Sequence, residues 1–186
     1  MNAVDQMCVL FDETQSWESE FTIKRNQYLK RIGEKETHVY FIRSGAIRVV
    51  YLDEDTEHSI RFGYRNNFIT LLDSLISGTP SLLSLQAIKK STIRTVALKT
   101  IDQLILTNTE FKALWYATLG GLIHQQMERE IDLLTASPLV RYQRVLARSH
   151  QLFQEIPHKF IASYLRMTPE TLSRIKKLDL NQDLSN

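Results

Sequence analysis

The last thirty residues hold the side chains whose types and spacing could do chemistry. On a helix that begins after Thr168, Arg174 can donate two hydrogen bonds to a guanine edge, and Glu170 can accept one from cytosine. Hydroxyl and ammonium groups on the same helix suit phosphates, which position a helix on a duplex without reading its sequence. The side chains predicted to contact DNA are Thr168, Glu170, Thr171, Ser173, Arg174, Lys176 and Lys177. This face predicts a recognition helix whose N-terminal half enters the major groove.

A helix-turn-helix over residues 157–177 would present this face. Each helix must bury apolar positions on its inner side, and Ala162 is small enough for the point where the two helices cross. The positions predicted to face inward are Ile161, Leu165, Met167, Leu172 and Ile175. Thr168 is a good N-cap, Pro169 suits the first helical position, and Glu170 favours the positive end of the helix dipole. The segment is therefore predicted to dock on DNA; the alternative is a helical hairpin with a solvated charged face.

Charge is distributed unevenly along the 186 residues, whose formal net charge is +2. Residues 136–186 carry eight lysines and arginines against four acids, whereas residues 1–135 carry 15 against 17. This asymmetry is typical of a nucleic-acid-binding part on a nearly neutral body, because duplex affinity depends largely on neutralising phosphates. An ordinary charged surface is the alternative explanation.

The N-terminal half consists of short apolar runs separated by polar turns. The runs predicted to be strands are 39–42, 46–52, 58–62, 82–88 and 93–98. Gly45 joins the first two runs, residues 53–57 form a polar turn before the third, and residues 68–76 could form a short helix between strands. The pattern predicts an antiparallel β-sandwich or barrel.

Helical spacing governs the rest of the chain. Residues 3–16 and 139–154 are expected to form helices, and a long helix is expected from about Thr107 to Ser137-Pro138, where proline ends it. Its apolar residues, at steps of three and four, are Trp115, Leu119, Leu122, Ile123, Met127, Ile131 and Leu134. This stripe can pack on the chain's own barrel or on a second copy. Gly120-Gly121 inside it costs about 1 kcal/mol per glycine, which close approach of a second backbone or a kink would explain.

These elements predict an α+β fold with an N-terminal antiparallel β-barrel, a long helix and a C-terminal all-α domain. The predicted domains are a sensor barrel at 1–106, a dimerisation helix at 107–136 and a helix-turn-helix domain at 137–186. No apolar run reaches the roughly 20 residues needed to span a bilayer, and the acidic N-terminus does not resemble a signal peptide. We therefore expect no membrane association and a cytoplasmic location.

The order of barrel, long helix and helix-turn-helix resembles the Crp/Fnr family of bacterial transcription regulators. The resemblance covers nearly the whole chain and is most specific at Ile156-Pro157, at 161–165 and at 168–175. It implies a homodimer paired along the long helix, and a ligand-sensing barrel of the cyclic nucleotide-binding type, which is a double-stranded β-helix. It also implies double-stranded DNA as a partner, base contacts by Glu170 and Arg174, and RNA polymerase as a further partner.

Three features depart from that family. Pro169 stands where the family often has a base-contacting Arg or Gln, which narrows what the helix can read. Arg166 stands where the turn usually has glycine, which implies a strained or differently shaped turn. Only nine residues follow Lys177, which leaves little room for the β-wing of some members.

The barrel lacks the charged anchors of a cyclic-nucleotide site. In that family a Gly-Glu pair and an Arg-Ser or Arg-Thr pair hold the ribose and the phosphate. Within 67–87, aligned through Phe68-Ile69, these positions read Thr70-Leu71 and Ser81-Leu82. An unpaired phosphate in a partly buried pocket costs several kcal/mol, so cyclic AMP or GMP is not expected to bind in the usual way. The cations that could substitute from another direction are Arg61, Arg65 and Lys89.

No metal, cofactor or catalytic motif is predicted. The five histidines, His38, His58, His124, His150 and His158, show no ligand spacing, and Cys8 alone cannot hold a cluster or a structural zinc. A cupin-like metal-dependent enzyme is the main alternative from another class, but the chain has no His-x-His. A ligand-binding oligomerisation module without DNA binding is a third interpretation. The sequence specifies neither an effector nor the residues that would bind one.

Overall fold

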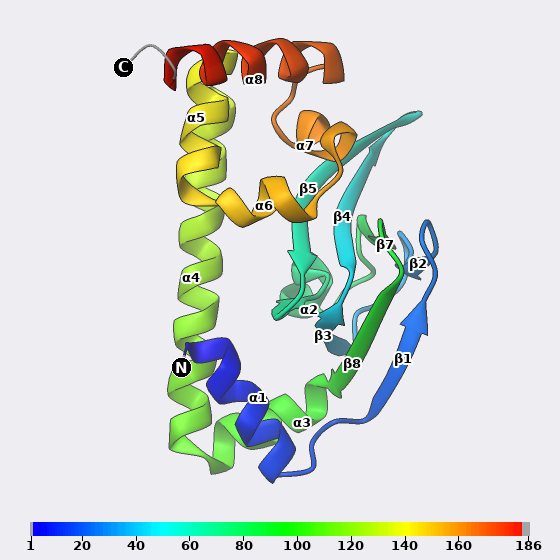
Figure 1. Ribbon diagram of the computed structural model, residues 1–186. Coiled ribbons are helices and arrows are strands. Elements are labelled where there is room, and N and C mark those ends of the chain that lie inside the picture. The colour runs from blue at the N-terminus through cyan, green and yellow to red at the C-terminus, as the bar shows by residue number, and fades with distance from the viewer. Residues whose placement is uncertain (1, 184–186) are drawn as a thin grey trace. The chain divides into compact units, whose positions relative to one another are not determined.

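The computed structural model of the chain describes residues 2–183. It divides into two compact units, Met1–Ile123 and His124–Asn186, and helix α4 (Thr109–Leu134) contributes to both (Figure 1). Residues 184–186, which the predicted C-terminal domain includes, lie outside the described residues, as does Met1. The predicted α+β fold is confirmed. Across 2–183, no helix has the length and apolar character that a membrane crossing requires.

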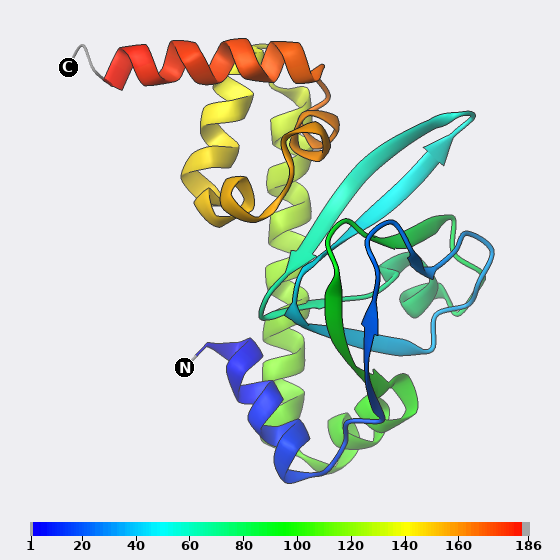
Figure 2. The same cartoon turned by 45° about the vertical axis from the view of Figure 1, so that its right-hand side comes forward.

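Two antiparallel sheets of four strands form the body of the N-terminal unit (Figure 1). The strands are β1 (Ser19–Ile23), β2 (Tyr28–Lys30), β3 (His38–Ser44), β4 (Ala46–Asp53), β5 (Thr56–Tyr64), β6 (Asn67–Ile69), β7 (Leu83–Ala87) and β8 (Ser91–Ala97). One sheet has the order β1-β8-β3-β6 and the other β2-β7-β4-β5. Figure 2 shows β4 and β5, in cyan, as a long hairpin. All five predicted strand runs are confirmed.

Gly45 lies where the chain crosses between the two sheets, because β3 and β4 belong to different ones. Its φ is +91°, in the left-handed region that favours glycine. A Cβ at this position would lie 2.4 Å from the Lys90 carbonyl oxygen and 2.6 Å from the Ser91 Cα. The backbone conformation and the close approach both require a residue without a side chain.

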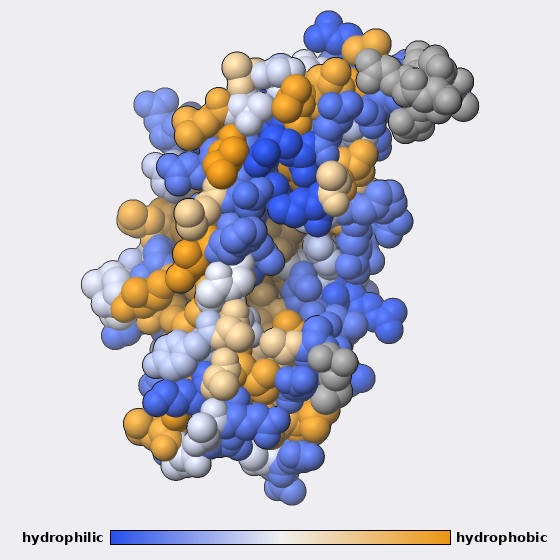
Figure 3. Space-filling view, turned by 90° about the vertical axis from the view of Figure 1, so that its left-hand side faces the viewer, coloured by the Kyte–Doolittle hydropathy of each residue, from blue (hydrophilic) through white to orange (hydrophobic). Residues whose placement is uncertain are grey.

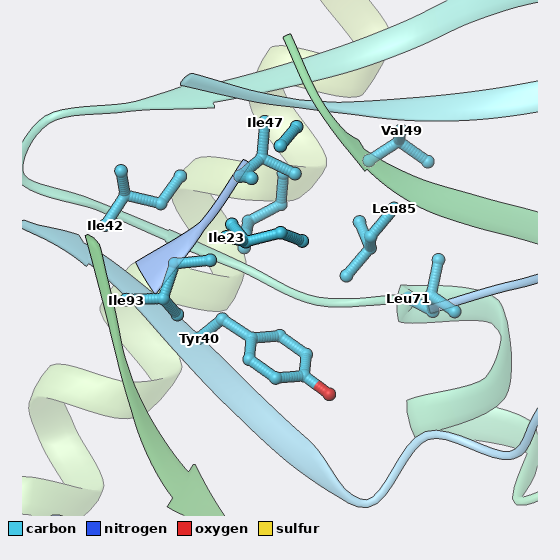
Figure 4. Close-up of a cluster of buried hydrophobic side chains, with 10 residues drawn as sticks. Ile23, Tyr40, Ile42, Ile47, Val49, Leu71, Leu85 and Ile93 are labelled. Carbon is cyan, nitrogen blue, oxygen red and sulfur yellow. The ribbon is translucent and has the colours of Figure 1, made fainter. Parts of the chain in front are cut away.

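Apolar side chains from both sheets fill the space between them (Figure 4). On β3, β4 and β7 the inward residues alternate along the strand, as for Tyr40 and Ile42, or Ile47 and Val49. The cluster consists of Ile23, Tyr40, Ile42, Ile47, Val49, Ile69, Leu71, Leu85, Ala87 and Ile93. Burial of each large aliphatic side chain contributes about 1.5–3 kcal/mol, so this layer holds the sheets together.

A second apolar cluster joins three helices to the opposite face of β3 and β8. It consists of Met7, Phe11, Val39, Val96, Ile101, Leu104 and Phe111. The helices are α1 (Ala3–Glu13), α3 (Leu98–Thr107) and the beginning of α4. The helix expected within residues 3–16 is confirmed, and Asn2 caps it by accepting a hydrogen bond from the Asp5 N–H at 2.9 Å. Helix α3 was not predicted.

The helix predicted at 68–76 is correct only in its second half. Helix α2 covers Leu72–Ser77, whereas Phe68 and Ile69 belong to β6 and pair with Phe41 and Tyr40 of β3. The Phe68 ring also contacts the rings of Phe11 and Phe41, at centroid distances of 6.0 and 5.1 Å. Sheet pairing and ring packing therefore override the local helical spacing.

Helix α4 has two neighbouring apolar faces, about 100° apart around its axis, where one stripe was predicted. Trp115, Leu119 and Leu122 are half-buried and face the N-terminal unit. The exposed apolar residues of the other, outer face are Tyr116, Ile123, Met127, Ile131 and Leu134. Figure 3 views the side on which α4 lies and shows apolar side chains, in orange, exposed among polar ones. The predicted stripe thus mixed residues of an inner and an outer face.

The C-terminal unit adds four helices to the end of α4. They are α5 (Pro138–Arg148), α6 (His150–Glu155), α7 (His158–Tyr164) and α8 (Pro169–Asp183). The single helix predicted at 139–154 is wrong, because Ser149 adopts φ −142° and ψ 60° and separates α5 from α6. The change of direction leaves Leu152 and Ile156 buried. Helix α8 continues past Lys177 to Asp183.

We predict that Gly45→Ala lowers the free energy of unfolding by clearly more than Gly33→Ala. Gly33 also has a positive φ, of +85°, but a Cβ there would meet nothing within 4 Å. Left-handed backbone alone costs a residue with a side chain roughly 1–2 kcal/mol, and the overlap with Lys90 and Ser91 adds to this only at Gly45. Urea unfolding of both variants measures the difference, and equal losses would contradict the close approach.

Candidate nucleic-acid interface

Helices α7 and α8 pack through the apolar residues predicted to face inward. Ala162, Leu165 and Leu172 have no exposed surface, and Ile161 and Ile175 are also buried. Met167 is half-buried. Because Ala162 is fully enclosed, a larger side chain there would separate the helices. The buried side of the predicted helix-turn-helix is therefore present.

The turn between the two helices has the left-handed backbone expected at Arg166, whose φ is +53°. That conformation costs a residue with a side chain roughly 1–2 kcal/mol, so other contacts must hold it. The Arg166 N–H donates to the Ser163 carbonyl at 3.1 Å, and the Met167 N–H donates to the Ala162 carbonyl at 3.0 Å. These bonds close the end of α7 and direct the chain into α8.

Helix α8 begins with the cap that its sequence predicts. The Thr168 hydroxyl oxygen accepts a hydrogen bond from the Thr171 N–H at 3.2 Å, and Pro169 is the first helical residue. The pKa of Glu170 is lowered, first because its carboxylate accepts from its own backbone N–H and then because it accepts from the Thr168 hydroxyl. Glu170 is therefore an ionised acceptor at neutral pH.

The seven residues predicted to contact DNA lie together on α8 and its cap. Thr168, Glu170, Ser173, Arg174 and Lys177 are exposed. Thr171 and Lys176 are half-buried, because they lie at the edge of the face that packs on α7. The structure therefore places all seven candidates within one turn and one helix.

His158, at the start of α7, is a neighbour of this face that the sequence analysis did not assign to it. Burial lowers the pKa of His158 first, and the nearby charge of Lys176 lowers it further, while Glu170 acts in the opposite direction. His158 therefore lies beside a lysine and a carboxylate of the candidate face. No spacing rule links residues 158 and 176, so only the fold reveals this group.

Two arginines that contributed to the basic C-terminal charge are used inside the C-terminal unit. Arg144 Nε donates to Asp132 Oδ1 at 3.0 Å, and Arg144 and Arg148 both bond Glu128 at 3.2 Å. Arg148 also bonds Asp132, and that hydrogen bond is the main reason why the pKa of Arg148 is raised. Asp132 has no exposed surface. These cations neutralise acids of α4 rather than phosphates, so the charge count overstated the basic surface.

The loop aligned with a phosphate site is closed by its own carboxylate. The Ser81 hydroxyl donates to both Asp73 oxygens at 2.8 Å, and the Leu82 N–H donates to Asp73 Oδ2 at 2.9 Å. Leu71, at the position of the ribose-binding Glu, has no exposed surface and belongs to the core in Figure 4. Its N–H donates to the buried Glu36 carboxylate at 3.2 Å. The donors that could hold an anion therefore already hold carboxylates of the chain.

Outside the strands, a small apolar cavity lies between α1, α2, α4 and the sheet that contains β3. Its volume is about 30 Å³, and Phe11, Leu75, Trp115 and Leu119 help to line it. This volume suits about one or two water molecules and is far below that of a nucleotide. Among the residues described, no three His, Cys, Asp or Glu side chains are grouped so that they could hold a metal ion.

The chain was compared with protein families, with curated sequences and with solved structures. Residues 20–108 match the family model of the cyclic nucleotide-binding domain. No curated protein sequence matches the chain. The solved structure of FixK2 from Bradyrhizobium japonicum is similar, with a TM-score of 0.73 and 21% identity over 89% of this chain and 85% of that one.

Two further solved structures are similar over most of their length. A CooA mutant from Carboxydothermus hydrogenoformans has a TM-score of 0.71 and 16% identity, over 92% of this chain and 79% of that one. A cyclic nucleotide-binding domain containing protein from Listeria monocytogenes has a TM-score of 0.73 and 13% identity, over 97% and 92%. Residues 20–108 are therefore similar to the cyclic nucleotide-binding domain, and the resemblance to the Crp/Fnr family is confirmed at the level of the fold.

Proposed function

We propose that this protein is a sequence-specific transcription regulator of the Crp/Fnr type that binds double-stranded DNA as a homodimer. It has no catalytic role, and RNA polymerase is its further partner. The observation that carries the proposal is the exposed face of α8, which presents Glu170, Ser173 and Arg174 on a helix whose inner residues Leu172 and Ile175 are buried. The similar fold of FixK2 and CooA supports it.

Base reading is assigned to Glu170 and Arg174. They are four residues apart, so they lie on the same face of α8, one turn from each other. The ionised Glu170 carboxylate accepts from cytosine N4, and the Arg174 guanidinium donates to guanine O6 and N7. Pro169 offers no side-chain donor and serves as the helix start, so the helix reads fewer bases than one with a polar residue there.

Phosphate contacts are assigned to the ends and edge of the same face. Thr168 and Thr171 lie at the positive N-terminal end of α8, where backbone N–H groups favour an anion. Lys176 and Lys177 supply cations one to two turns further along. Ser173 lies between these groups and can contact either a base or a phosphate.

The homodimer forms along the outer face of α4. Its exposed residues Tyr116, Ile123, Met127 and Leu134 recur at steps of seven, four and seven, which is the heptad-type spacing of paired helices. At about 100° per residue, Gly120 lies within about 40° of Tyr116 around the helix axis, whereas Gly121 lies about 140° away. A Cβ at Gly120 would meet nothing within 4 Å in the chain itself, so the space beside this glycine is available to a second helix.

Cyclic nucleotides do not control this regulator. The carboxylate of Asp73 takes the donors of Ser81 and Leu82, and a phosphate brought there would meet its negative charge. Leu71 cannot bond a ribose from inside the apolar core. A nucleotide would have to displace Asp73 from Ser81 and Leu82 and to move Leu71 out of the core. Buried polar groups would then be left unpaired, which costs about 1–3 kcal/mol for each group.

We predict that Arg174→Ala lowers discrimination between a DNA site selected from a random duplex pool and unrelated DNA by about 5- to 150-fold. The reason is that a bidentate arginine–guanine pair is worth about 1–3 kcal/mol of discrimination. Lys177→Ala is the control: it should weaken binding to both DNAs alike and reduce the salt slope by about 1. Unchanged discrimination in Arg174→Ala would remove that residue from the base-reading role.

We predict that Gly120→Leu shifts the monomer–dimer equilibrium toward the monomer by at least about tenfold, whereas Gly121→Leu leaves it nearly unchanged. Both changes raise helix propensity by nearly the same amount, so only the position differs. Sedimentation equilibrium at micromolar concentration measures the effect. A wild-type monomer at that concentration would contradict the dimer, and equal association of the two variants would contradict close helix approach at Gly120.

We predict that isothermal titration calorimetry detects no binding of cyclic AMP or cyclic GMP up to about 1 mM ligand. Absence of a charged partner for the phosphate and the presence of Asp73 are the physical reasons. Competition by either nucleotide in the DNA-binding assay provides an independent measurement. Micromolar affinity for either one would refute the role given to Asp73 and Leu71.

A further inference from the structure

Arg141 on α5 points inward, and its side chain joins two helix ends. The residue is only 9% exposed. Its Nε and Nη2 atoms donate to the Thr135 carbonyl at 3.3 and 2.8 Å. Its Nη1 atom donates to the Leu165 carbonyl at 2.6 Å and to the Arg166 carbonyl at 3.4 Å. One guanidinium therefore links the end of α4 to the turn before α8.

The acceptors explain why a cation can be buried here. Thr135 directly follows the last residue of α4, and Leu165 directly follows the last residue of α7. Carbonyl groups at helix C-termini lack intrahelical partners and carry the negative end of the helix dipole. Arg141 thus neutralises two helix ends at once. A lysine has neither the planar fork nor enough donors in fixed directions to bridge both.

The turn that Arg141 holds is the one that aims the candidate recognition helix. Leu165 ends α7, Arg166 has the unfavourable φ of +53°, and Thr168 caps α8 two residues later. A strained residue keeps its conformation only when its surroundings enforce it. The two hydrogen bonds from Arg141 to Leu165 and Arg166 supply such a constraint on the carbonyl side of the turn.

We propose that Arg141 is a positioning residue for DNA binding: it touches no DNA, and it sets the direction of α8 by fixing the turn to the end of α4. This inference rests on the proposed function of α8. Arg144 provides a matched comparison, since it lies one turn further along α5 and also bonds the end of α4, through Glu128 and Asp132, without reaching the turn.

The test compares Arg141→Met, Arg141→Lys and Arg144→Met in the full-length protein, below the melting transition of each variant. We expect both Arg141 variants to bind the selected DNA site at least tenfold more weakly, with the salt slope unchanged because no phosphate contact is lost. Arg144→Met should stay within about twofold of the wild type. Adding Arg166→Gly to Arg141→Met should restore at least part of the affinity, because glycine adopts the turn without enforcement.

Amide hydrogen exchange in the absence of DNA makes the result independent of the proposed function. We expect faster exchange in residues 163–172 of Arg141→Lys than in those of Arg144→Met. Equal exchange of that segment in the two variants, or wild-type DNA affinity of a folded Arg141 variant, would overturn the proposal. A salt slope lowered by about 1 in the Arg141 variants would overturn it as well, since it would indicate a phosphate contact. Faster exchange in a protein whose wild type binds no duplex would support the role of Arg141 in the turn and refute the proposed function.

Discussion

Helix α4 must satisfy two apolar faces at once, and the organisation of the chain follows from this constraint. Its inner face completes the apolar layer over the sheet that contains β3 and β8, through Phe111 and Trp115. Its outer face, from Tyr116 to Leu134, remains exposed, and burial of such surface is worth roughly 25 cal/mol per Å². Because one continuous helix carries both faces, the packing that stabilises the N-terminal unit also fixes which side of α4 stays exposed.

Near its C-terminal end the same helix carries the buried Asp132, and the carbonyl of Thr135 follows it. Both need hydrogen-bond donors from the C-terminal unit. Arg144 and Arg148 of α5 donate to Asp132, and Arg141 donates to the carbonyl after the last turn. A buried carboxylate without these partners would be strongly unfavourable, so the arginines are committed to the fold. The cations that remain on the surface of α8, Arg174 and Lys177, are few, and the proposed DNA affinity therefore depends on the placement of this helix more than on total charge.

Local features were predictable from the sequence, and features that depend on distant partners were not. The cap at Thr168 and the buried positions Leu172 and Ile175 follow from rules that act within one helix, and the structure has them. Alternating apolar runs gave the strands, but the break at Ser149 and helix α3 were missed because tertiary burial decides them. The inward direction of Arg141 depends on carbonyls 6 and 24 residues away, and no spacing rule links these groups.

The barrel shows how a binding fold can persist without its usual binding groups. Contacts within the chain hold the segment 71–82, which includes α2, in place. Leu71 is part of the core, and Asp73 accepts hydrogen bonds from Ser81 and Leu82. An arginine at Ser81 would need an external anion for its charge, whereas a serine is satisfied by the neighbouring carboxylate. The loop is therefore stable with no ligand present. In the proposed regulator, the N-terminal unit keeps its fold without a cyclic nucleotide. It packs against the inner face of α4 whether or not such a ligand is present.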